Sequence, residues 1–321
     1  MKPVVLVTAL GTMASTTIVA QLRKTKAYYI IGADINQANQ IASSRDVDEF
    51  TVFPPSIENL DAYMDFVLDF CEKKHVQYYF ATIDEEIVNL SRNRKRFEDI
   101  GVRLCIPNHD LVMTCHYKNV FNDWIKQNFG DLSIKTYRDL DAIPEGDFPI
   151  FIKPIEGRAS IGCRKIENRN ELAMLEVDLQ LGEYIVQEFV SGEIVTVDMV
   201  RNARSGQHRQ IQRLETLRNG NGCGIAVEII HDEKLEAFCS ALMLRLDLNG
   251  VINAEFFRVG DAYKIIEVNP RFSAGTSFSC MAGCNTVLEA LRIADGAPDL
   301  LPSSIQYGKH FAKRYETYLM D

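Results

Sequence analysis

Paired cysteines, an excess of basic residues and long apolar runs are all absent from this sequence. Its eight cysteines contain no CxxC pair, so the spacing of a zinc site is missing and reduced, mostly buried thiols are expected. The 35 Lys and Arg against 44 Asp and Glu give a net charge of −9, which argues against binding a nucleic-acid backbone. No apolar run approaches the roughly 20 residues of a membrane span, and no signal-peptide pattern is present. We therefore expect a cytoplasmic protein with small-molecule partners and neither nucleic acid nor membrane among them; a homodimer is compatible with the sequence.

Glycine-rich nucleotide motifs are absent as well. The loop at 10–16 follows the first predicted strand but holds a single glycine, Gly11, and neither GxGxxG nor a Walker sequence. Asp34 ends the second predicted strand in the position of a ribose-binding acid, yet without further glycines the backbone cannot approach a pyrophosphate. A dinucleotide site is therefore disfavoured, and the strand ends at Gly11 and 82–86 are more typical of a small-molecule cleft. The six histidines show no spacing that requires a metal or a general base.

The first third of the chain alternates strand and helix patterns, which predicts an open parallel α/β sheet. A length of 321 residues suggests about two domains. Strands are predicted at 3–10, 28–33, 48–53, 76–82 and 102–107, with helices at 14–22 and 60–71. Ser56 is expected to cap the second helix. The basic run at 92–96 is expected to be a solvated helix face.

The second part of the chain begins after Pro107, where the composition shifts. Thr114 is predicted to cap a helix that ends before Gly130, and Asp232 to cap another. An apolar strand carries Lys153 close to its end, and a lysine there is costly unless its charge has a partner. The small residues that follow let backbone N–H groups surround phosphate oxygens. These features indicate an anion-binding site in the second part.

A predicted β-hairpin near the C-terminal end carries the most informative acids. Glu267 and Asn269 are two residues apart, so on a strand they share one face. Glu255 joins that face only if it lies opposite Glu267, which requires Val259 opposite Tyr263 across three residues, or an equivalent bulge. Two carboxylates and an amide oxygen suit Mg²⁺, which completes its shell with water and phosphate. A solvated acidic hairpin is the competing interpretation, but the apolar neighbours of Glu267 predict a buried strand, where a carboxylate needs a partner.

The order of these motifs resembles that of the ATP-grasp superfamily, most closely the carbamoyl-phosphate synthase large-subunit type, over nearly the whole chain. The motifs that carry the resemblance are Lys118, the strand and small-residue loop at 148–162, QEFVSGE at 187–193, NAE at 253–255 and EVNPRFS at 267–273. The resemblance implies a Rossmann-like, open parallel α/β domain at 1–112, followed by a two-lobed α+β ATP-grasp domain at 113–321. Within the latter, a lid lobe would span roughly 131–187 and a metal-binding lobe roughly 188–321.

The resemblance also implies a complete ATP site between the two lobes. The residues it assigns to ATP are Lys118 and Lys153 at the phosphates, Gly157, Ser160 and Gly162 in the covering loop, Gln187, Glu188, Phe189 and Val190 at the adenine, and Glu193, with Glu188 as the alternative, at the ribose. The residues it assigns to Mg²⁺ are Glu255, Glu267 and Asn269, holding two ions that Mn²⁺ could replace. Arg271 would be catalytic and stabilise charge on the transferring phosphoryl group, unless it only braces the loop at 272–275.

Two further residues keep open assignments. Arg213 either contacts substrate or phosphate or is an arginine on the surface of a strand, and the sequence favours neither. Ser273 follows Arg271 closely and is a second candidate for contact with substrate or phosphate. Ala274 stands where similar proteins often have glycine. Its methyl group could narrow the acceptor pocket, so the substrate cannot be inferred from the resemblance.

The chemistry implied is that of an ATP-dependent ligase that joins a carboxylate to an amine or a similar nucleophile. Phosphoryl transfer from ATP would convert the carboxylate into an acyl phosphate, which needs mainly positioning and charge neutralisation. Two alternatives stay open: an enzyme that phosphorylates a small carboxylate or carbamate, and a catalytically inactive nucleotide-binding regulatory protein. The complete set of metal ligands argues against the second, because a pure binding protein could lose Glu255 or Glu267.

Overall fold

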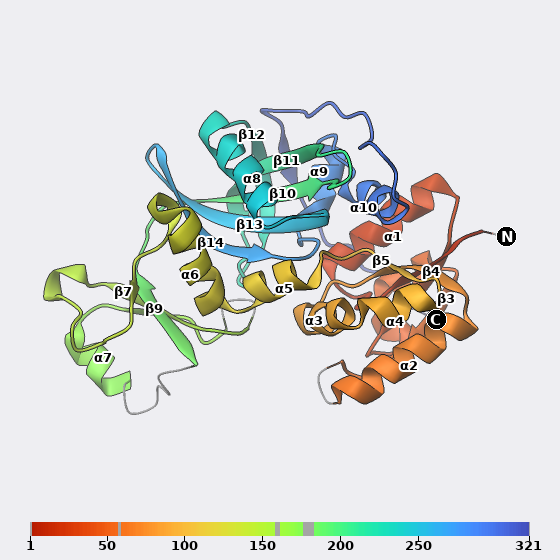
Figure 1. Cartoon of the computed structure of the whole chain (residues 1–321), viewed down its shortest axis with the longest axis horizontal. Helices are drawn as coiled ribbons and strands as arrows, with labels where there is room; N and C mark the ends of the chain where they lie inside the picture. Colours follow the sequence, from red (N-terminus) through yellow and green to blue (C-terminus); the bar gives the residue numbers. More distant parts are fainter. Residues whose placement is uncertain (1, 57–58, 158–160, 176–182, 321) are drawn as a thin grey trace.

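The computed structural model describes residues 2–56, 59–157, 161–175 and 183–320. Within these residues the strands form three sheets: a five-stranded parallel sheet from the N-terminal third, a four-stranded antiparallel sheet from the middle, and a six-stranded antiparallel sheet from the C-terminal part. The five-stranded and four-stranded sheets lie at opposite ends of the molecule, with the six-stranded sheet between them (Figure 1). This confirms the expected fold class, a parallel α/β domain followed by two α+β lobes.

The N-terminal sheet has the strand order β3-β2-β1-β4-β5, and its pairs are parallel. Its strands are β1 (Val4–Val7), β2 (Tyr29–Asp34), β3 (Glu49–Val52), β4 (Val76–Phe80) and β5 (Arg103–Leu104), and its helices are α1 (Met13–Thr25), α2 (Leu60–Lys73), α3 (Asp84–Arg92) and α4 (Arg94–Asp99). The order reverses between β1 and β4, so a crevice opens at their carboxyl ends, the usual ligand position in open α/β sheets. Asp84 begins α3 at this point.

The cap of α2 differs from the sequence prediction. Asn59, not Ser56, is the N-cap, and its side-chain oxygen accepts a hydrogen bond from the Ala62 N–H. A capping side chain must reach the free N–H groups of the first turn. Ser56 lies too far before the first helical residue, Leu60, to do so.

The helix predicted from Thr114 is also different, because two helices occupy that region. They are α5 (His109–His116), capped by Asn108, and α6 (Lys118–Asn128). Thr114 lies inside α5, where its hydroxyl donates to the carbonyl four residues earlier, as hydroxyl side chains often do in helix interiors. The predicted end of the helical region before residue 130 is correct.

The four-stranded sheet has the order β6-β9-β7-β8 and covers a small apolar core of its own. Its strands are β6 (Thr136–Tyr137), β7 (Ile150–Pro154), β8 (Arg164–Ile166) and β9 (Tyr184–Glu188), accompanied by α7 (Arg169–Leu175). The described part of the chain also contains the 3₁₀ turns Ala38–Gln40, Ala42–Asp46, Gly130–Leu132 and Glu145–Asp147. Strand β7 contains Lys153, so this sheet carries a lysine into the interior, where it is 6% exposed.

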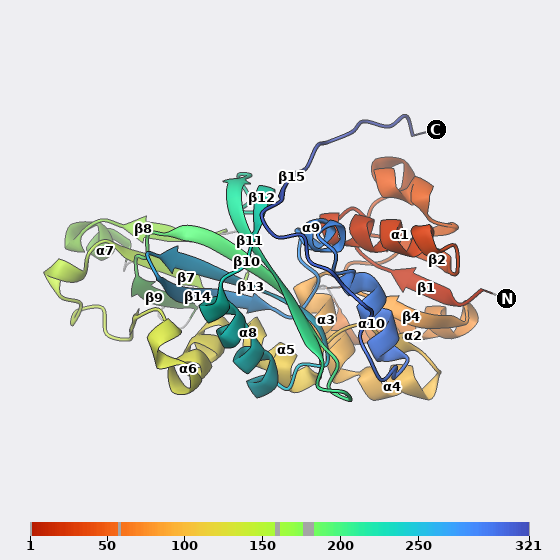
Figure 2. The same ribbon diagram turned by 90° about the horizontal axis from the view of Figure 1, so that it is seen from above.

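The six-stranded sheet has the order β14-β13-β10-β11-β12-β15. Its strands are β10 (Glu193–Arg201), β11 (His208–Arg218), β12 (Gly224–Ile230), β13 (Gly250–Val259), β14 (Ala262–Asn269) and β15 (His310–Ala312), and the helices beside it are α8 (Glu233–Arg245), α9 (Thr276–Met281) and α10 (Thr286–Ala294). Asp232 caps α8, as predicted. Figure 2 shows the long strands β10, β11 and β13 extending between the other two sheets. Among the described residues, every helix is too short or too polar to cross a bilayer.

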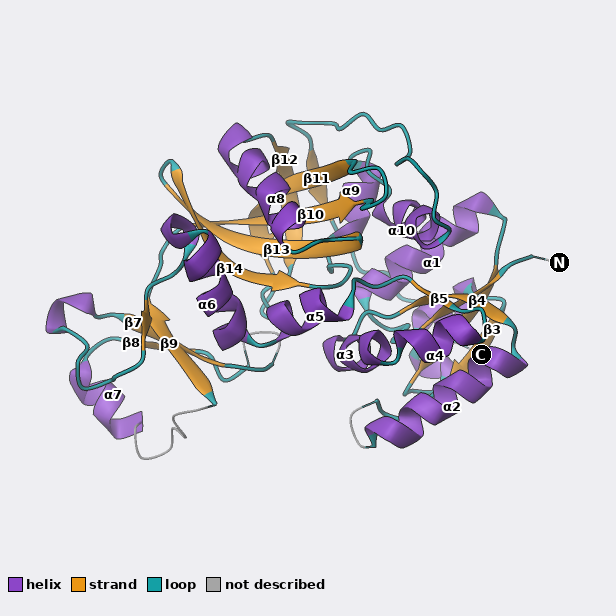
Figure 3. Cartoon of the chain, viewed as in Figure 1, coloured by secondary structure: helices purple, strands orange, loops and turns teal. Residues whose placement is uncertain are grey.

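The two faces of the six-stranded sheet have different partners. One face packs on α5, α6 and α8 (Figure 3) through an apolar core that includes Val195, Val197 and Ala254. At one end of the opposite face, Val200 and Val251 belong to a core shared with α1, α9, α10 and the N-terminal sheet. This shared core docks the N-terminal sheet against the large sheet. The rest of that face is polar and borders a cavity.

Candidate active site

A cavity of about 550 Å³ lies between the four-stranded and six-stranded sheets, beside the start of α3. Its walls come from the start of α3, from α5 and α6, from β7 and β9 of the four-stranded sheet, and from β10, β11, β13 and β14. Residues that line it and were expected in the site are Lys118, Lys153, Gly157, Gln187, Glu188, Phe189, Val190, Arg213, Glu255, Glu267, Asn269, Arg271 and Ser273. Among the described residues, Gly162 and Glu193 do not line the cavity.

Polar side chains on four neighbouring strands form the floor of this cavity. Glu267 lies opposite Glu255 on the β14–β13 pair. Thr196 on β10 lies opposite Glu255 on one side and Arg213 on the other. Because side chains alternate between the faces of a strand, residues two positions away share this face. They are Asn269 on β14, Asn253 on β13, Asp198 on β10 and Glu215 on β11.

A β-bulge brings Glu255 and Glu267 together. The hairpin turn has two residues, not three, because Val259 pairs with Ala262 rather than with Tyr263. On that register alone, Glu255 would face the residue before Glu267. The register shifts next to Glu255, and this bulge, the alternative expected from the sequence, restores the pairing of the two acids.

Glu255 and Glu267 form a centre of excess negative charge. Burial, and next the charge of Glu267, raise the pKa of Glu255 to about 8. Asn269 Nδ2 donates to Glu267 Oε1 at 3.0 Å. Two carboxylates and an amide suit Mg²⁺. The raised pKa indicates that a bound cation would stabilise the ionised form of these carboxylates. No cluster of three or more His, Cys, Asp and Glu with metal-binding geometry occurs in the described residues, so an ion at this pair would need phosphate and water oxygens as well.

Two lysines border the same cavity. The Nζ of Lys153 lies 3.4 Å from the carbonyl oxygen of Ile266, the residue that the bulge leaves without a cross-strand partner. Burial lowers the pKa of Lys153, and the charge of Glu267 opposes that shift. Lys118 begins α6, and its Nζ donates to the Gly157 carbonyl at 2.8 Å. Cations from one side and acids from the other therefore meet in one cavity.

The loop expected to cover the phosphates is bounded by glycines in the left-handed region. Gly157 has a φ of +125° and Gly162 a φ of +77°. A Cβ on Gly162 would also lie 2.9 Å from Pro154 Cγ, so the backbone of the loop, rather than a ligand, requires glycine at this position. Ser160 lies outside the described residues, and its role stays a prediction.

The run expected at the adenine ends β9 and lines the cavity. The Gln187 side chain is buried and donates to Asn122 Oδ1 at 3.0 Å, which ties β9 to α6. Glu188 lines the cavity, whereas Glu193 is mostly exposed and its carboxylate lies 2.7 Å from Arg258. Glu193 would have to exchange Arg258 for a ribose, and Glu188 would have to release the Lys135 N–H, which donates to its Oε1 at 3.1 Å. The position of Glu188 in the cavity wall is what supports this alternative acid.

Arg271 joins the large sheet to the N-terminal domain. Its Nε donates to Asp84 Oδ1 at 2.7 Å, and its Nη2 to Asn269 Oδ1 at 3.2 Å. Asp84 lies at the crevice of the N-terminal sheet, in the strand-end region expected to line a cleft. These contacts hold the guanidinium between an N-terminal acid and a metal-ligand candidate, and not against the loop at 272–275.

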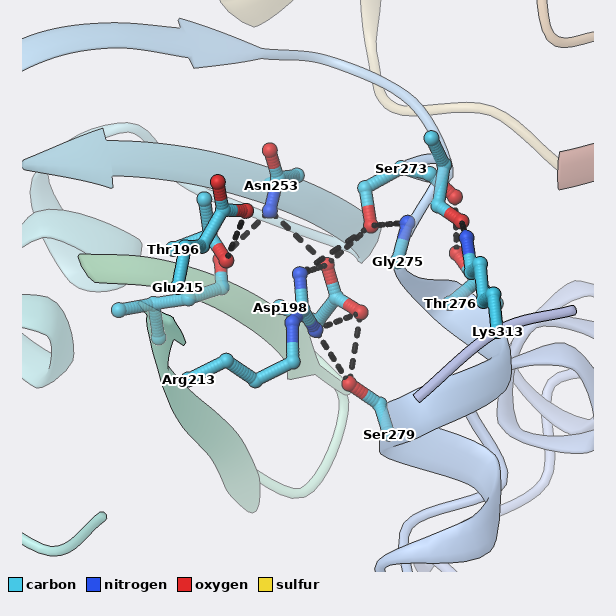
Figure 4. A network of polar contacts seen from close by, with 12 residues as sticks. Thr196, Asp198, Arg213, Glu215, Asn253, Ser273, Gly275, Thr276, Ser279 and Lys313 are labelled. Atoms are coloured by element: carbon cyan, nitrogen blue, oxygen red, sulfur yellow. Dashed lines mark hydrogen bonds and ion pairs between the residues drawn. The ribbon is translucent and has the colours of Figure 1, made fainter. Parts of the chain in front are cut away.

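Arg213 is a buried side chain, so its interpretation as a strand-surface arginine is wrong. It is 1% exposed and paired with Asp198, with Nη2 donating to Oδ1 at 3.1 Å (Figure 4). Ser273 and Ser279 hydroxyls also donate to Asp198, at 2.8 and 2.7 Å. Burial alone would raise the pKa of Asp198, but the Arg213 charge and these hydrogen bonds outweigh it and hold the pKa below its usual range. A Cβ on Gly275 would lie 2.8 Å from Arg213 Nη2, so Arg213 packs closely against the loop that follows β14.

Sequence reasoning missed two charged residues of the cavity wall, Glu215 and Arg218. Arg218 Nε lies 2.7 Å from Glu215 Oε2, and its Nη2 lies 3.2 Å from Glu255 Oε2. Burial raises the pKa of Glu215. Period-2 spacing from Arg213 could have identified Glu215. It could not have identified Arg218, because the ladder of β11 shifts register just before that residue.

Asp34 has a structural role. Its Oδ2 accepts a hydrogen bond from the Gly11 N–H at 2.9 Å, and its Oδ1 accepts bonds from the Asn36 backbone and side chain. The side chain is 7% exposed. These bonds satisfy the carboxylate within the protein.

Two family models and several curated relatives match parts of the chain. The model described as "ATP-grasp in the biosynthetic pathway with Ter operon" matches residues 180–312, and the model described as "PylC-like, N-terminal domain" matches residues 5–105. Two relatives are 3-methyl-D-ornithine–L-lysine ligases: that of Methanosarcina acetivorans is 27% identical over 154 residues, and that of Methanosarcina mazei 24% identical over 151. Each match covers 47% of this chain, but only 39% and 38% of the relatives' lengths.

Solved structures share the fold over almost the whole chain. The biotin carboxylase domain of Hydrogenobacter thermophilus 2-oxoglutarate carboxylase, solved with MgADP, ADP and bicarbonate, has a TM-score of 0.74 at 15% identity, covering 97% of this chain and 73% of that one. An ADP complex of N5-carboxyaminoimidazole ribonucleotide synthetase has a TM-score of 0.73 at 14% identity, with 97% and 81% coverage. The L-amino acid ligase of Bacillus licheniformis has a TM-score of 0.69 at 14% identity, with 92% and 74% coverage. At these identities the likeness establishes the fold.

Proposed function

We propose that the chain is a member of the ATP-grasp superfamily, whose model matches residues 180–312, and that it is an ATP-dependent ligase that joins a carboxylate to an amine through an acyl phosphate. The observation that carries the proposal is the meeting of Lys153, Glu255, Glu267 and Arg271 in one cavity. Phosphoryl transfer requires cations at the phosphates, metal ligands beside them and a group that stabilises charge on the moving phosphoryl. The four-stranded sheet supplies the cation Lys153, and the six-stranded sheet and the loop after it supply the metal ligands and Arg271.

The roles of the ATP-binding residues follow from their places in the cavity. Lys118 and Lys153 would bind phosphate oxygens, and the loop that contains Gly157, Ser160 and Gly162 would exclude water, which otherwise hydrolyses an acyl phosphate. The backbone at 187–190 would contact the adenine, with Glu188 ahead of Glu193 at the ribose.

The metal and the catalytic arginine complete the proposal. Glu255, Glu267 and Asn269 would hold two Mg²⁺ ions, which Mn²⁺ could replace, and the bound metal would neutralise phosphate charge. Arg271, held by Asp84 and Asn269, would stabilise the charge that develops as the phosphoryl group moves to the carboxylate. We assign Arg213 and Ser273 to holding the loop at 272–275 rather than to direct contact with substrate.

The substrates are proposed only as chemical classes. The curated relatives are named for 3-methyl-D-ornithine and L-lysine, and one structural neighbour is an L-amino acid ligase. These names support amino acids as the first candidates for both the carboxylate and the amine. Amino sugars and other small acids come next. The same proposal includes the carbamoyl-phosphate synthase type, the domain boundary near residue 112, a homodimer and a cytoplasmic location.

The test is ADP release with Mg²⁺ and ATP, screened against pairs of amino acids, amino sugars and small acids. Release that needs both a carboxylate and an amine supports the ligase. Release with a carboxylate alone, accompanied by an acyl phosphate that hydroxylamine traps as a hydroxamate, supports the phosphorylating enzyme instead. Tight MgATP binding without release under any pair would support a nucleotide-binding regulatory protein.

A further inference from the structure

One charged side chain of the cavity has no role in the proposed reaction. Arg218 ends β11 and contacts Glu255 Oε2 through Nη2 at 3.2 Å. Glu255 is the acid assigned to the metal, so the guanidinium lies against a carboxylate oxygen that an ion would need. The Arg218 side chain is 31% exposed, which leaves it room to change direction.

We propose that Arg218 is an exchangeable counter-ion of the metal site. In the metal-free protein it lies against Glu255 and offsets the negative charge that the Glu255–Glu267 pair retains. A divalent ion that binds Glu255 displaces it, because two cations close to one carboxylate repel each other. The released guanidinium then meets the carboxylate of the substrate. This inference rests on the proposed metal site and on the proposed carboxylate substrate.

Glu215 would keep the Arg218 guanidinium close to the site after it leaves Glu255. It contacts the Nε of Arg218 at 2.7 Å and itself accepts a hydrogen bond from Thr196 Oγ1 at 3.2 Å. Gly224 leaves the space for this buried acid, because a Cβ there would lie 2.7 Å from Glu215 Oε1. The charge of Glu215, rather than a hydrogen bond, attracts Nε, so loss of the Glu255 contact frees the Nη atoms of Arg218. Paired N–H groups of a guanidinium match a carboxylate in a bidentate geometry.

The turn that follows Arg218 is stabilised by hydrogen bonds of its own. It is closed by Asn219, whose Oδ1 accepts hydrogen bonds from the Asn221 and Cys223 N–H groups at 3.1 and 2.9 Å. The same turn lines the cavity. Arg218 on β11 and Arg271 after β14 therefore flank the acids of the floor from its two outer strands, which places a positive charge on each side of the reacting anions.

The first test is a Mn²⁺ titration of the nucleotide-free protein, followed by electron paramagnetic resonance. R218Q removes the competing cation, and we expect it to bind Mn²⁺ about two- to fivefold more tightly, the range of a partly exposed ion pair. R218K keeps the charge and should bind as the wild type does. R258Q is the matched control, because Arg258 has a similar exposure and pairs with Glu193 outside the cavity. Equal or weaker binding by R218Q overturns the proposal, since Arg218 would then be irrelevant to Glu255 or hold it in place for the metal.

The second test follows the release of the side chain. The rate of phenylglyoxal modification of Arg218, resolved by mass spectrometry of peptides cut at acidic residues, should rise when MnCl₂ is added. An unchanged or lower rate contradicts release. The rate at Arg258 serves as the internal control and should not change.

The third test concerns the anion that Arg218 meets. With the carboxylate found by the ADP-release screen, R218Q should raise its KM about tenfold, as expected for loss of a charged hydrogen bond, and leave the KM for ATP within about twofold. An unchanged KM for the carboxylate would show that Arg218 does not bind the substrate carboxylate. If Mn²⁺ affinity and modification change as expected but no carboxylate supports ADP release, the ligase function fails and the counter-ion exchange stands. If a carboxylate and an amine support ADP release but neither Mn²⁺ affinity nor modification changes, the ligase function stands and the counter-ion exchange fails.

Discussion

Two groups of buried charges lie on the same face of the six-stranded sheet, and they are balanced in opposite ways. Asp198 receives hydrogen bonds from Arg213, Ser273 and Ser279, and its pKa is lowered. Glu255 faces a second acid and contacts one guanidinium, that of Arg218, at 3.2 Å, and its pKa is raised to about 8.

The difference separates a structural network from a site that needs a ligand. A buried charge with a full set of donors is satisfied within the protein, and its loss costs stability. A buried charge that repels its neighbour lowers the stability of the protein until a cation binds. Uncompensated buried charges of this kind are common at functional sites. Adjacent strands of one sheet therefore carry both kinds, and each can be altered without the other.

The largest effect is expected from breaking the balanced group. Asp198→Asn leaves Arg213 buried without a counter-charge, so the free energy of unfolding should fall by about 3–5 kcal/mol, measured by urea denaturation. Asp48→Asn, which breaks the more exposed Arg23–Asp48 pair, should cost less than about 1 kcal/mol. Adding Arg213→Met to Asp198→Asn should recover part of the loss. A single variant as stable as wild type would show that the network does not hold this part of the fold.

The second effect tests the reaction itself. Arg271→Lys keeps the charge but loses the planar fork, so kcat for ADP release should fall about 10²-fold, the cost of one well-placed donor, with ATP affinity nearly unchanged. Arg258→Lys, on the same sheet but outside the cavity, should leave kcat close to wild type. An Arg271→Lys enzyme that is stable, binds ATP and is fully active would rule out a catalytic role.

The third effect concerns the cation opposite the acids. Lys153→Ala should weaken MgATP binding about tenfold or more, because a charged hydrogen bond to phosphate is lost, while the melting temperature changes little. Calorimetric titration of wild type, Lys153→Ala and Lys126→Ala, an exposed lysine of α6, checks this. Equal affinities in all three would defeat the assignment of Lys153.

The last prediction sharpens the comparison through pH. The pKa of Glu255 in the folded protein, about 8, lies above that of an unfolded glutamate, about 4.3. Between these values the folded state binds the extra proton, so this group makes the metal-free protein less stable as pH rises from about 5 to 8, by at most about 1.4 kcal/mol per pH unit. Glu255→Gln should remove that slope, and Asp198→Asn should not. A slope that persists in Glu255→Gln would assign it to another group.

More of the fold than of the contacts in the site could be predicted from the sequence. Strand and helix alternation in the first third and the Asp232 cap are confirmed because both depend on residues close together in the chain. Ser56 and Thr114 failed as caps because an asparagine lies nearer the true helix start in each case.

The shared face of Glu267 and Asn269 was determined by the sequence alone, since side chains on a strand alternate with a period of two. The pairing of Glu255 with Glu267, the Asp84–Arg271 contact, the burial of Arg213 and the position of Arg218 were decided only by the tertiary structure. Each of them depends on a bulge, a register shift or the docking of segments distant in the chain. Local periodicity carries no information about which distant strand lies opposite, because that choice is made by the packing of whole sheets against their shared cores.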